Sequence, residues 1–330
     1  MKNKRCPSSL TIFTGILLLA SLTGCIEFDT DKEEKTPGTV YKPIWYPGLY
    51  WVYTFTTPEF QQIVSKMVVA ADDGINHLVG ISTLLDAQRH AVLNFNPVLG
   101  RVRMEDMAVY EKGVPQVILS FPLKERKIWN FSLLDVENFT AEVKKIWAAD
   151  LASGERTVLV EVEALAASGE RMHYVYDSEA MWLRSLNFTS SDGETKLEMK
   201  LVSYGDGFSG TVYFVRGRDL YNGDYTSTVG EPVVEIYDSF VDTGHPRYGA
   251  FDNLIYFLEV KTDQDGSGSL YLRDHTGESA LTRSFGPNTE ESSLGTIPSS
   301  SGNWTVEINL QGNAHLRLRV AGGIVYSWDV

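Results

Sequence analysis

A glycine-rich segment in the middle of the chain has the spacing of a dinucleotide-binding loop. Residues 205–210 read Gly-Asp-Gly-Phe-Ser-Gly, which matches the pattern G-x-G-x-x-G. That pattern binds a dinucleotide only where a strand precedes it and a helix follows, because the phosphates lie at the helix N-terminus. Residues 211–215 are β-branched and aromatic, and they predict a strand instead. We therefore interpret residues 205–210 as a hinge between two domains, since glycine adopts backbone conformations that other residues resist.

Aspartates in the last third of the chain are candidate calcium ligands. Residues 263–266 partly resemble a calcium-binding loop, but the first ligand position of that register holds Lys261, a cation. Loop carboxylates supply the hard oxygen ligands that Ca²⁺ prefers. A looser calcium site therefore stays a candidate, and otherwise we expect no cofactor. Its ligands would come from Asp238, Asp242, Asp252 and Asp265.

The sequence contains none of the common catalytic motifs. No two of its six histidines have metal-ligand spacing, and neither a G-x-S-x-G elbow nor an S-x-x-K motif occurs. The only cysteines are Cys6 and Cys25, so no thiol nucleophile or disulfide framework follows residue 25. We expect a protein that is not an enzyme, although catalytic groups could assemble from distant residues. A cleft with converging carboxylates and histidine would indicate that alternative.

Aromatic residues are plentiful, with 7 Trp, 16 Tyr and 15 Phe. Five of them cluster near the start of the predicted fold, and such a cluster could stack on sugars or line a lipid groove. We interpret them mainly as core residues, which is the commoner role of aromatic side chains in strands. The five are Trp45, Tyr46, Tyr50, Trp51 and Tyr53.

The amino terminus has the features of a secretory signal. Basic residues at positions 2, 4 and 5 precede a mostly apolar stretch over residues 10–22, which is too short to span a bilayer. It ends in Leu-Thr-Gly-Cys at residues 22–25, which resembles the lipobox of bacterial, and some archaeal, lipoproteins. The resemblance implies cleavage before Cys25 and a diacylglyceryl group on its thiol. Two or more acyl chains hold a protein stably on a membrane. Because Ile26 rather than Asp follows, we expect the outer membrane in a Gram-negative host and otherwise an extracytoplasmic lipid anchor.

Charge excludes a nucleic-acid partner. The whole chain carries −14, and loss of residues 1–24 with their three basic side chains makes this −17. The charge divides into −9 over residues 26–208 and −8 over residues 209–330. Such a surface repels phosphate backbones and anionic head groups.

Short β-type runs with turn signals between them continue through most of the chain. We predict a signal peptide over residues 1–24, a charged tether over 25–44, and an antiparallel β domain over 45–210 that forms a curved sheet or half-barrel. Only residues 83–89 and 123–129 suggest short helices. Residues 121–129, Phe-Pro-Leu-Lys-Glu-Arg-Lys-Ile-Trp, resemble an F-P-L-x-x-G-K-x-W element of uncharacterised envelope lipoproteins with curved sheets. Arg126 replaces the glycine of that element.

Residues 211–330 predict a second domain that is also all-β. Strands such as residues 303–308 and 315–320 alternate cleanly between apolar and polar side chains, which indicates one dry face and one wet face. Two sheets packed as a sandwich satisfy that pattern. The order of runs from residue 268 to 306 resembles the final strands of CUB-like and prepeptidase-type jelly rolls, which implies a secreted accessory module.

Two functions fit these features. The first is a membrane-anchored envelope lipoprotein that binds a protein or glycan without catalysis. The second is a carrier of lipid or another apolar ligand in a groove of the first β domain. A continuous apolar pocket of several hundred Å³ would favour the carrier, and a concave face filled by side chains would favour the binding module.

Overall fold

The computed structural model describes residues 38–150, 154, 156–231 and 233–330, and these belong to one compact unit. Cys25, the predicted signal peptide and the first part of the predicted tether lie outside the described residues. Within the predicted tether, Val40 already pairs with Leu123, through N···O distances of 2.9 and 2.7 Å.

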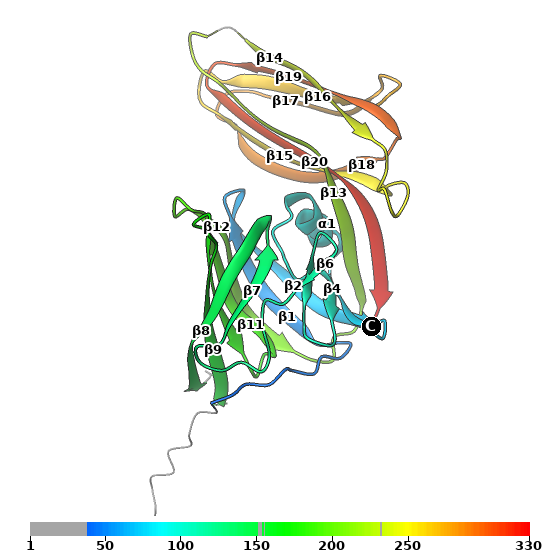
Figure 1. Ribbon diagram of the computed structural model, residues 1–330. Helices are drawn as coiled ribbons and strands as arrows, with labels where there is room; N and C mark the ends of the chain where they lie inside the picture. Colours follow the sequence, from blue (N-terminus) through cyan, green and yellow to red (C-terminus); the bar gives the residue numbers. More distant parts are fainter. Residues whose placement is uncertain (1–37, 151–153, 155, 232) are drawn as a thin grey trace, which may run out of the picture. The chain divides into compact units, whose positions relative to one another are not determined.

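The described chain is almost entirely antiparallel β-structure, which confirms the all-β prediction (Figure 1). Helix α1 spans Leu84–Leu93. The strands of the first part are β1 (Tyr50–Thr57), β2 (Phe60–Asp72), β3 (Asn76–Ile81), β4 (Gly100–Arg103), β5 (Val109–Glu111), β6 (Val114–Gln116), β7 (Ile128–Leu133), β8 (Val136–Asp150), β9 (Arg156–Leu165), β10 (Arg171–Asp177), β11 (Trp182–Thr189) and β12 (Thr195–Gly205). Those of the second part are β13 (Thr211–Ser227), β14 (Val234–Asp242), β15 (Asn253–Thr262), β16 (Ser267–Arg273), β17 (Ser279–Phe285), β18 (Glu290–Pro298), β19 (Gly302–Gln311) and β20 (Ala314–Asp329).

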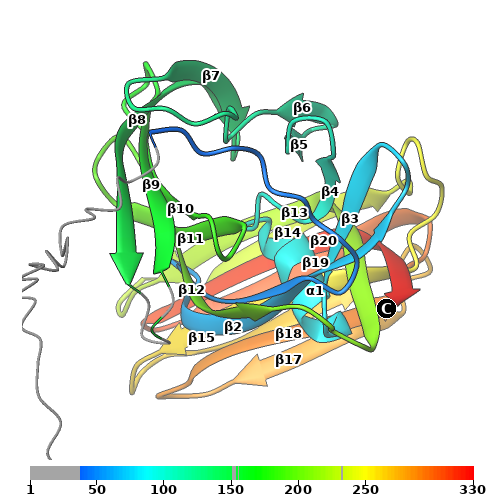
Figure 2. The same cartoon turned by 90° about the horizontal axis from the view of Figure 1, so that it is seen from below.

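The first twelve strands form the predicted curved sheet. Their order is β6-β5-β4-β3-β2-β1-β12-β11-β10-β9-β8-β7, and each neighbouring pair is antiparallel. Figure 2 shows the sheet curling round until its two ends, β6 and β7, approach each other. The backbone amide of Ser132 on β7 donates to the side-chain carbonyl of Gln116 on β6 at 2.7 Å, which links these ends.

The concave face of this sheet is filled by side chains. Strand β1 alternates strictly between half-buried and buried residues, and Trp51, Tyr53 and Phe55 point inward with no exposed surface. Trp45, from the segment before β1, packs on Trp51 and Trp182 at ring-centroid distances of 4.8 and 4.7 Å. The predicted aromatic cluster therefore contributes mainly to the core, apart from Tyr46, which is exposed.

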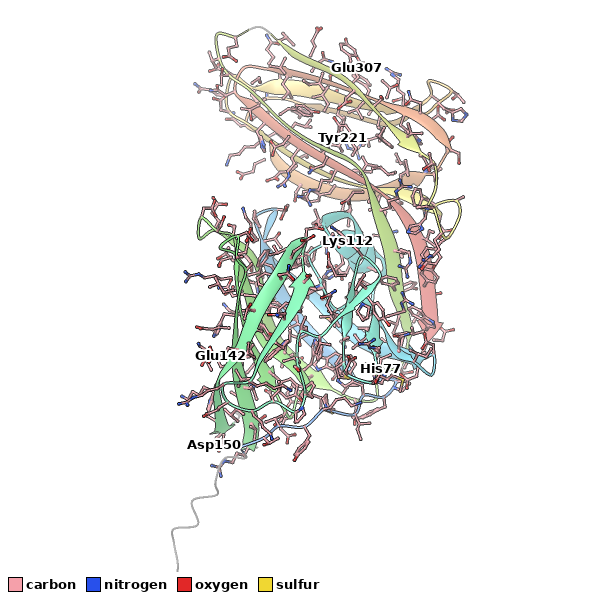
Figure 3. All side chains as sticks on the ribbon, in the orientation of Figure 1. His77, Lys112, Glu142, Asp150, Tyr221 and Glu307 are labelled. Atoms are coloured by element: carbon pink, nitrogen blue, oxygen red, sulfur yellow. The ribbon has the colours of Figure 1, made fainter. Side chains whose placement is uncertain are left out.

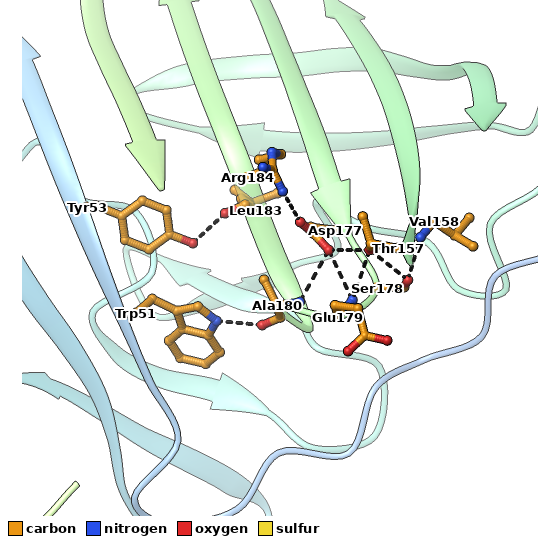
Figure 4. A network of polar contacts seen from close by, with 10 residues as sticks. All are labelled: Trp51, Tyr53, Thr157, Val158, Asp177, Ser178, Glu179, Ala180, Leu183 and Arg184. Carbon is orange, nitrogen blue, oxygen red and sulfur yellow. Dashed lines mark hydrogen bonds and ion pairs between the residues drawn. The ribbon is translucent and has the colours of Figure 1, made fainter. Parts of the chain in front are cut away.

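The buried carboxylate of Asp177 fixes the turn between β10 and β11. The indole of Trp51 in the core hydrogen-bonds to this turn (Figure 4). Asp177, which is fully buried, accepts hydrogen bonds from the hydroxyl of Thr157 and the amide of Glu179, and forms an ion pair with Arg184. The indole of Trp51 donates to the carbonyl of Ala180 in the same turn. The turn thus connects β1 with the β10–β11 end of the curved sheet, across the intervening strand β12.

The last eight strands form a jelly roll. One sheet has the order β18-β15-β20-β13 and the other β14-β19-β16-β17, so every strand of the first has its chain neighbour in the second. Inward-facing side chains from both sheets form one apolar core, which includes Leu258, Leu270, Trp304 and Leu318. The predicted β-sandwich fold of the second half of the chain is confirmed.

Two long strands connect the jelly roll to the curved sheet. β13 and β20 pair along almost their whole length, from Thr211↔Asp329 to Ser227↔Ala314, and β13 also meets β3 at Tyr213↔Ile81. The strand expected after Gly210 is therefore present, and no helix follows the glycine-rich segment.

Helix α1 packs on these long strands near their middle. Thr83 is its N-cap and accepts from the amide of Asp86, as the prediction of a helix from residue 83 requires. A Cβ atom at Gly217 of β13 would lie 2.6 Å from the carbonyl oxygen of Ala91, so only glycine allows this close approach. No helix in the described part of the chain has the length and apolar character needed to cross a membrane.

The second predicted helix, over residues 123–129, is wrong. Leu123 pairs with Val40, and Arg126 has φ +64°, a left-handed conformation that a helix excludes. β7 begins at Ile128. Local apolar spacing suggested a helix here, whereas pairing with a distant segment determines the backbone.

Candidate functional site

A cleft of about 760 Å³ opens where the curved sheet meets the jelly roll. Its walls come from the end of α1, the β4–β6 hairpins, β13, and the loop between β14 and β15. Figure 3 labels Lys112, one of its lining residues, at the end of the β5–β6 hairpin. Gly100 keeps this wall close to β13, because a Cβ atom there would lie 2.8 Å from the ring of Phe214. The size falls within the usual range for sites that bind small ligands.

Arginines line this cleft or border it without acidic partners. Arg101, Arg216 and Arg247 are lining residues, and Arg218 lies beside them, donating to the carbonyl of Gly244 at 2.6 Å. Among the described residues, none of the ion pairs involves any of these four side chains. The Nε of Arg216 is buried and has no hydrogen-bond partner in the described structure.

Aromatic rings hold two of these guanidinium groups. The Cζ of Arg216 lies 4.5 Å from the ring centroid of Tyr248 and 5.4 Å from that of Phe214. The Cζ of Arg101 lies 4.7 Å from the ring centroid of Tyr110. These distances are typical of cation–π contacts, which position the groups without neutralising their charge.

The pKa values of His245 and Tyr248, in the β14–β15 loop, are shifted by the positive charges around them. Burial lowers the pKa of His245, and the charges of Arg216, Arg218 and Arg247 lower it further. Burial alone would raise the pKa of the Tyr248 hydroxyl, but the charges of Arg216, Arg101 and Arg247, together with a hydrogen bond from Arg247, outweigh burial and lower that pKa below its ordinary value. Both shifts have the sign that surrounding cations produce.

Three acidic residues also line the cleft, and two of them form contacts with neighbouring residues. Asp135 pairs with Lys112 at 2.6 Å, and Glu111 faces the backbone amides of Leu134 and Asp135 at 3.4 Å. The third is Asp219, whose pKa is raised, mainly by burial.

His90 forms part of the cleft wall and is a buried neutral imidazole. Its Nε2 lies 3.2 Å from the hydroxyl of Ser65, which is 1% exposed, and its Nδ1 has no hydrogen-bond partner in the described structure. Burial lowers its pKa to about 3, with a contribution from the charge of Arg89. This serine–histidine pair lacks a carboxylate to orient the imidazole, and its hydroxyl is not accessible, so it does not form a nucleophile–base pair.

A second, smaller cleft of about 490 Å³ adjoins the first, and Asn94, Leu134 and Asp135 line both. Here one carboxylate oxygen of Glu59 accepts from Arg317 at 3.2 Å and from Arg319 at 3.0 Å. These contacts link the start of β2 to β20. In the second cleft, Glu59 therefore pairs with the two arginines that line it, and these ion pairs hold the two parts of the fold together.

The structure does not bring the four candidate calcium ligands together. Asp242 is buried and accepts from the amide of Gly244 and the hydroxyl of Ser299. Asp252 accepts from the amide of Val325, Asp238 accepts from the amide of Ser239, and Asp265 is exposed in another loop. Within the described ranges, no three His, Cys, Asp or Glu side chains gather to hold a metal ion. Their spacing in the sequence could not reveal that Asp238 and Asp242 belong to strand β14 whereas Asp252 and Asp265 lie in two other segments.

Sequence reasoning missed the arginine cluster. Five of the eight basic residues in residues 211–330 lie at the junction of the two parts, although the segment is acidic overall. The available signals were the pairs Arg216–Arg218 and Arg317–Arg319, each with one residue between. Alternation places both members of a pair on one face of a strand.

No known protein-family model matches the chain, and no curated protein matches its sequence. Weak likeness to solved structures includes a structure of the infectious bursal disease virus Gx strain, with 11% identity, a TM-score of 0.20, and coverage of 86% of this chain and 69% of that one. A Bacillus thuringiensis Cry1Da tryptic core variant has 9% identity, a TM-score of 0.21, and coverage of 85% and 53%. An exo-β-1,3-galactanase from Phanerochaete chrysosporium has 7% identity, a TM-score of 0.19, and coverage of 78% of each chain. None of these bears on the activity of this protein.

Proposed function

We propose that this protein is a lipid-anchored lipoprotein of the cell envelope that binds an oligosaccharide in the junction cleft without transforming it. The observation that carries this proposal is the open cleft of about 760 Å³ with Tyr110, Phe214 and Tyr248 in its walls. Sugar rings present polarised C–H groups on one face, and these pack on the electron-rich faces of aromatic rings. The guanidinium and amide groups between the rings supply donors for sugar hydroxyls.

The size of the cleft favours an oligosaccharide over a protein partner. A cleft of this volume encloses a ligand of a few rings. A stable protein–protein interface covers about 800 Å² on each partner and has an apolar centre. The cleft walls instead mix aromatic, charged and amide side chains. A protein partner is thus the outcome to be excluded by experiment.

The anchored location rests on the lipobox resemblance at residues 22–25. A carrier of apolar ligands is less well supported, because core side chains occupy the concave face of the curved sheet. A catalytic role is less well supported because Glu111 and Asp135, two of the three acidic residues in the cleft, already have local partners.

A glycan array tests this proposal directly. Full-length protein in detergent should bind a subset of glycans, and Tyr248→Ala should weaken that binding at least tenfold. Tyr237→Ala, which removes a tyrosine from β14 that is more exposed than Tyr248, should leave it unchanged. Recovered glycan should have its original mass after prolonged incubation. A blank array, or binding that ignores Tyr248, contradicts glycan binding in the cleft, and a shortened glycan contradicts the non-enzymatic role.

A further inference from the structure

We infer that the ligand of the junction cleft is an acidic oligosaccharide, whose carboxylate or sulfate groups bind to Arg216, Arg101 and Arg247. This inference rests on the proposed glycan binding and specifies which glycans are selected. The arginines of the cleft support an acidic ligand, whereas its aromatic rings support the binding of a glycan.

The cleft is less acidic than the molecule as a whole, because four basic residues and three acidic ones line it: Arg101, Lys112, Arg216 and Arg247 against Glu111, Asp135 and Asp219. The chain has 43 acidic and 29 basic residues, so a random surface concavity would be negative. This one has four arginines in it or beside it, and none of the four forms an ion pair within the described chain. Like charges held close together repel one another, and a bound anion relieves that repulsion.

Arg216 has the features of a ligand-binding group rather than a structural one. Its Cζ lies over the rings of Tyr248 and Phe214, at 4.5 and 5.4 Å from their centroids, and Tyr326 adds a third ring at 5.9 Å. The N–H donors of a guanidinium form a planar fork that matches a carboxylate or sulfate.

Arg101 and Arg247 reach the same cleft from other elements. Arg101 comes from β4, with its guanidinium on the ring of Tyr110, and Arg247 comes from the exposed loop that also carries Tyr248. Three cations on separate elements, each beside an aromatic ring or in the same loop, can bind charged groups on successive sugar units.

The decisive experiment compares matched glycans that differ only in charge. Full-length protein is titrated with oligogalacturonate, with its methyl ester, and with a sulfated oligosaccharide and its desulfated form. We expect an acidic form to bind at least tenfold more tightly than its neutral partner, and the difference to shrink between 50 and 500 mM NaCl because salt screens the attraction. Which acidic form binds more tightly distinguishes carboxylate from sulfate.

Two variants test the assignment of the residues. Arg216→Gln should abolish the preference for the acidic form, and Arg101→Gln, on the opposite wall, provides an independent test if the first variant unfolds. Arg171→Gln removes the same charge from an exposed position on β10 and should keep the full preference. A preference that survives both cleft variants would overturn the inference.

The outcomes separate this inference from the proposal on which it rests. Equal binding of acidic and neutral forms would overturn the acidic ligand and leave glycan binding intact. Binding of no glycan at all would overturn both. Binding of poly-glutamate as tight as that of the acidic glycan, with the same dependence on Arg216, would also overturn both and indicate an acidic peptide as the ligand.

Discussion

His90 is a histidine that the fold holds in its neutral form. It packs between Phe55 and Phe95 at centroid distances of 5.0 and 4.2 Å, and burial lowers its pKa to about 3. An unfolded chain binds this proton near pH 6.5, so between pH 6.5 and pH 3 the unfolded state carries more protons than the folded state. The contribution of His90 to stability is therefore complete above pH 6.5 and is lost as the pH falls toward 3.

We predict that His90→Gln reduces the acid sensitivity of the fold. The shift corresponds to up to roughly 5 kcal/mol of stability lost across this pH range in the natural protein. Urea unfolding of the full-length protein at several pH values measures the slope. His275→Gln, which removes an exposed histidine, should keep the natural slope. Equal slopes for His90→Gln and the natural protein would contradict a neutral buried imidazole.

Arg126 occupies a backbone conformation that suits glycine. Its φ is +64°, and its amide donates to the carbonyl of Val143 at 2.8 Å, so the turn before β7 fixes it there. The sequence element that residues 121–129 resemble has glycine at this position. Arg126 thus holds a backbone conformation that glycine adopts more readily.

Arg126→Gly should raise the free energy of unfolding by about 0.5–1 kcal/mol, because it removes the strain of a side chain at positive φ. Lys124→Gly, at an exposed position of the same loop with ordinary φ, should lower it by a similar amount. Denaturant midpoints of both variants check this. A loss of stability in Arg126→Gly would show that its side chain makes a contact worth more than the strain.

At the scale of elements, the Asp177 network connects the neighbouring strands β9, β10 and β11 of the curved sheet. Asp177 is fully buried, while its partner Arg184 is 41% exposed. Removing the carboxylate leaves Thr157 and two backbone amides without an acceptor, although Arg184 can be hydrated. Removing Asp177 is therefore more destabilising than removing Arg184.

We predict that Asp177→Ala costs about 3 kcal/mol, the lower end of the range for a broken buried ion pair. Glu163→Ala, which removes an exposed carboxylate from neighbouring β9, should cost less than about 1 kcal/mol. Thermal unfolding of the two variants gives the comparison. Similar costs would show that the network contributes no more than a surface ion pair.

Most strands could be predicted from the sequence because alternation and turn residues are local properties. β19 and the first half of β20 show this, since their alternation is complete and each has one dry face. Helix α1 was also predictable, because its cap at Thr83 is local. The second helix failed because the conformation of residues 123–129 depends on Val40, which is distant in the chain.

At the scale of the whole molecule, the junction could not be predicted. At one end of the β13–β20 pair, Thr211 lies opposite Asp329, which is 118 residues away in the chain. The glycine-rich segment between the two parts indicated only a hinge. The cleft combines residues near positions 90–112, 214–216 and 245–248, and no local pattern connects these segments. The sequence therefore predicted two β folds but not the site that they form together.

Cys25 should carry the lipid that anchors the molecule. We predict that the protein purified from its own membranes begins at Cys25 and that intact mass spectrometry finds a diacylglyceryl group on its thiol. Cys25→Ala should prevent this modification, whereas Cys6→Ala should not, because Cys6 leaves with the signal peptide. An unmodified thiol at Cys25, or cleavage at another residue, would contradict the lipoprotein assignment.

The central claim is that the arginine- and ring-lined cleft is where the ligand binds. Hydroxyl-radical footprinting of the full-length protein, with and without oligogalacturonate, tests it most directly. We predict that Tyr248, Phe214 and Tyr110 become protected while exposed Tyr237 on β14 does not. Protection confined to Tyr237 or other surfaces, with the three cleft rings unchanged while the ligand is bound, would contradict the claim.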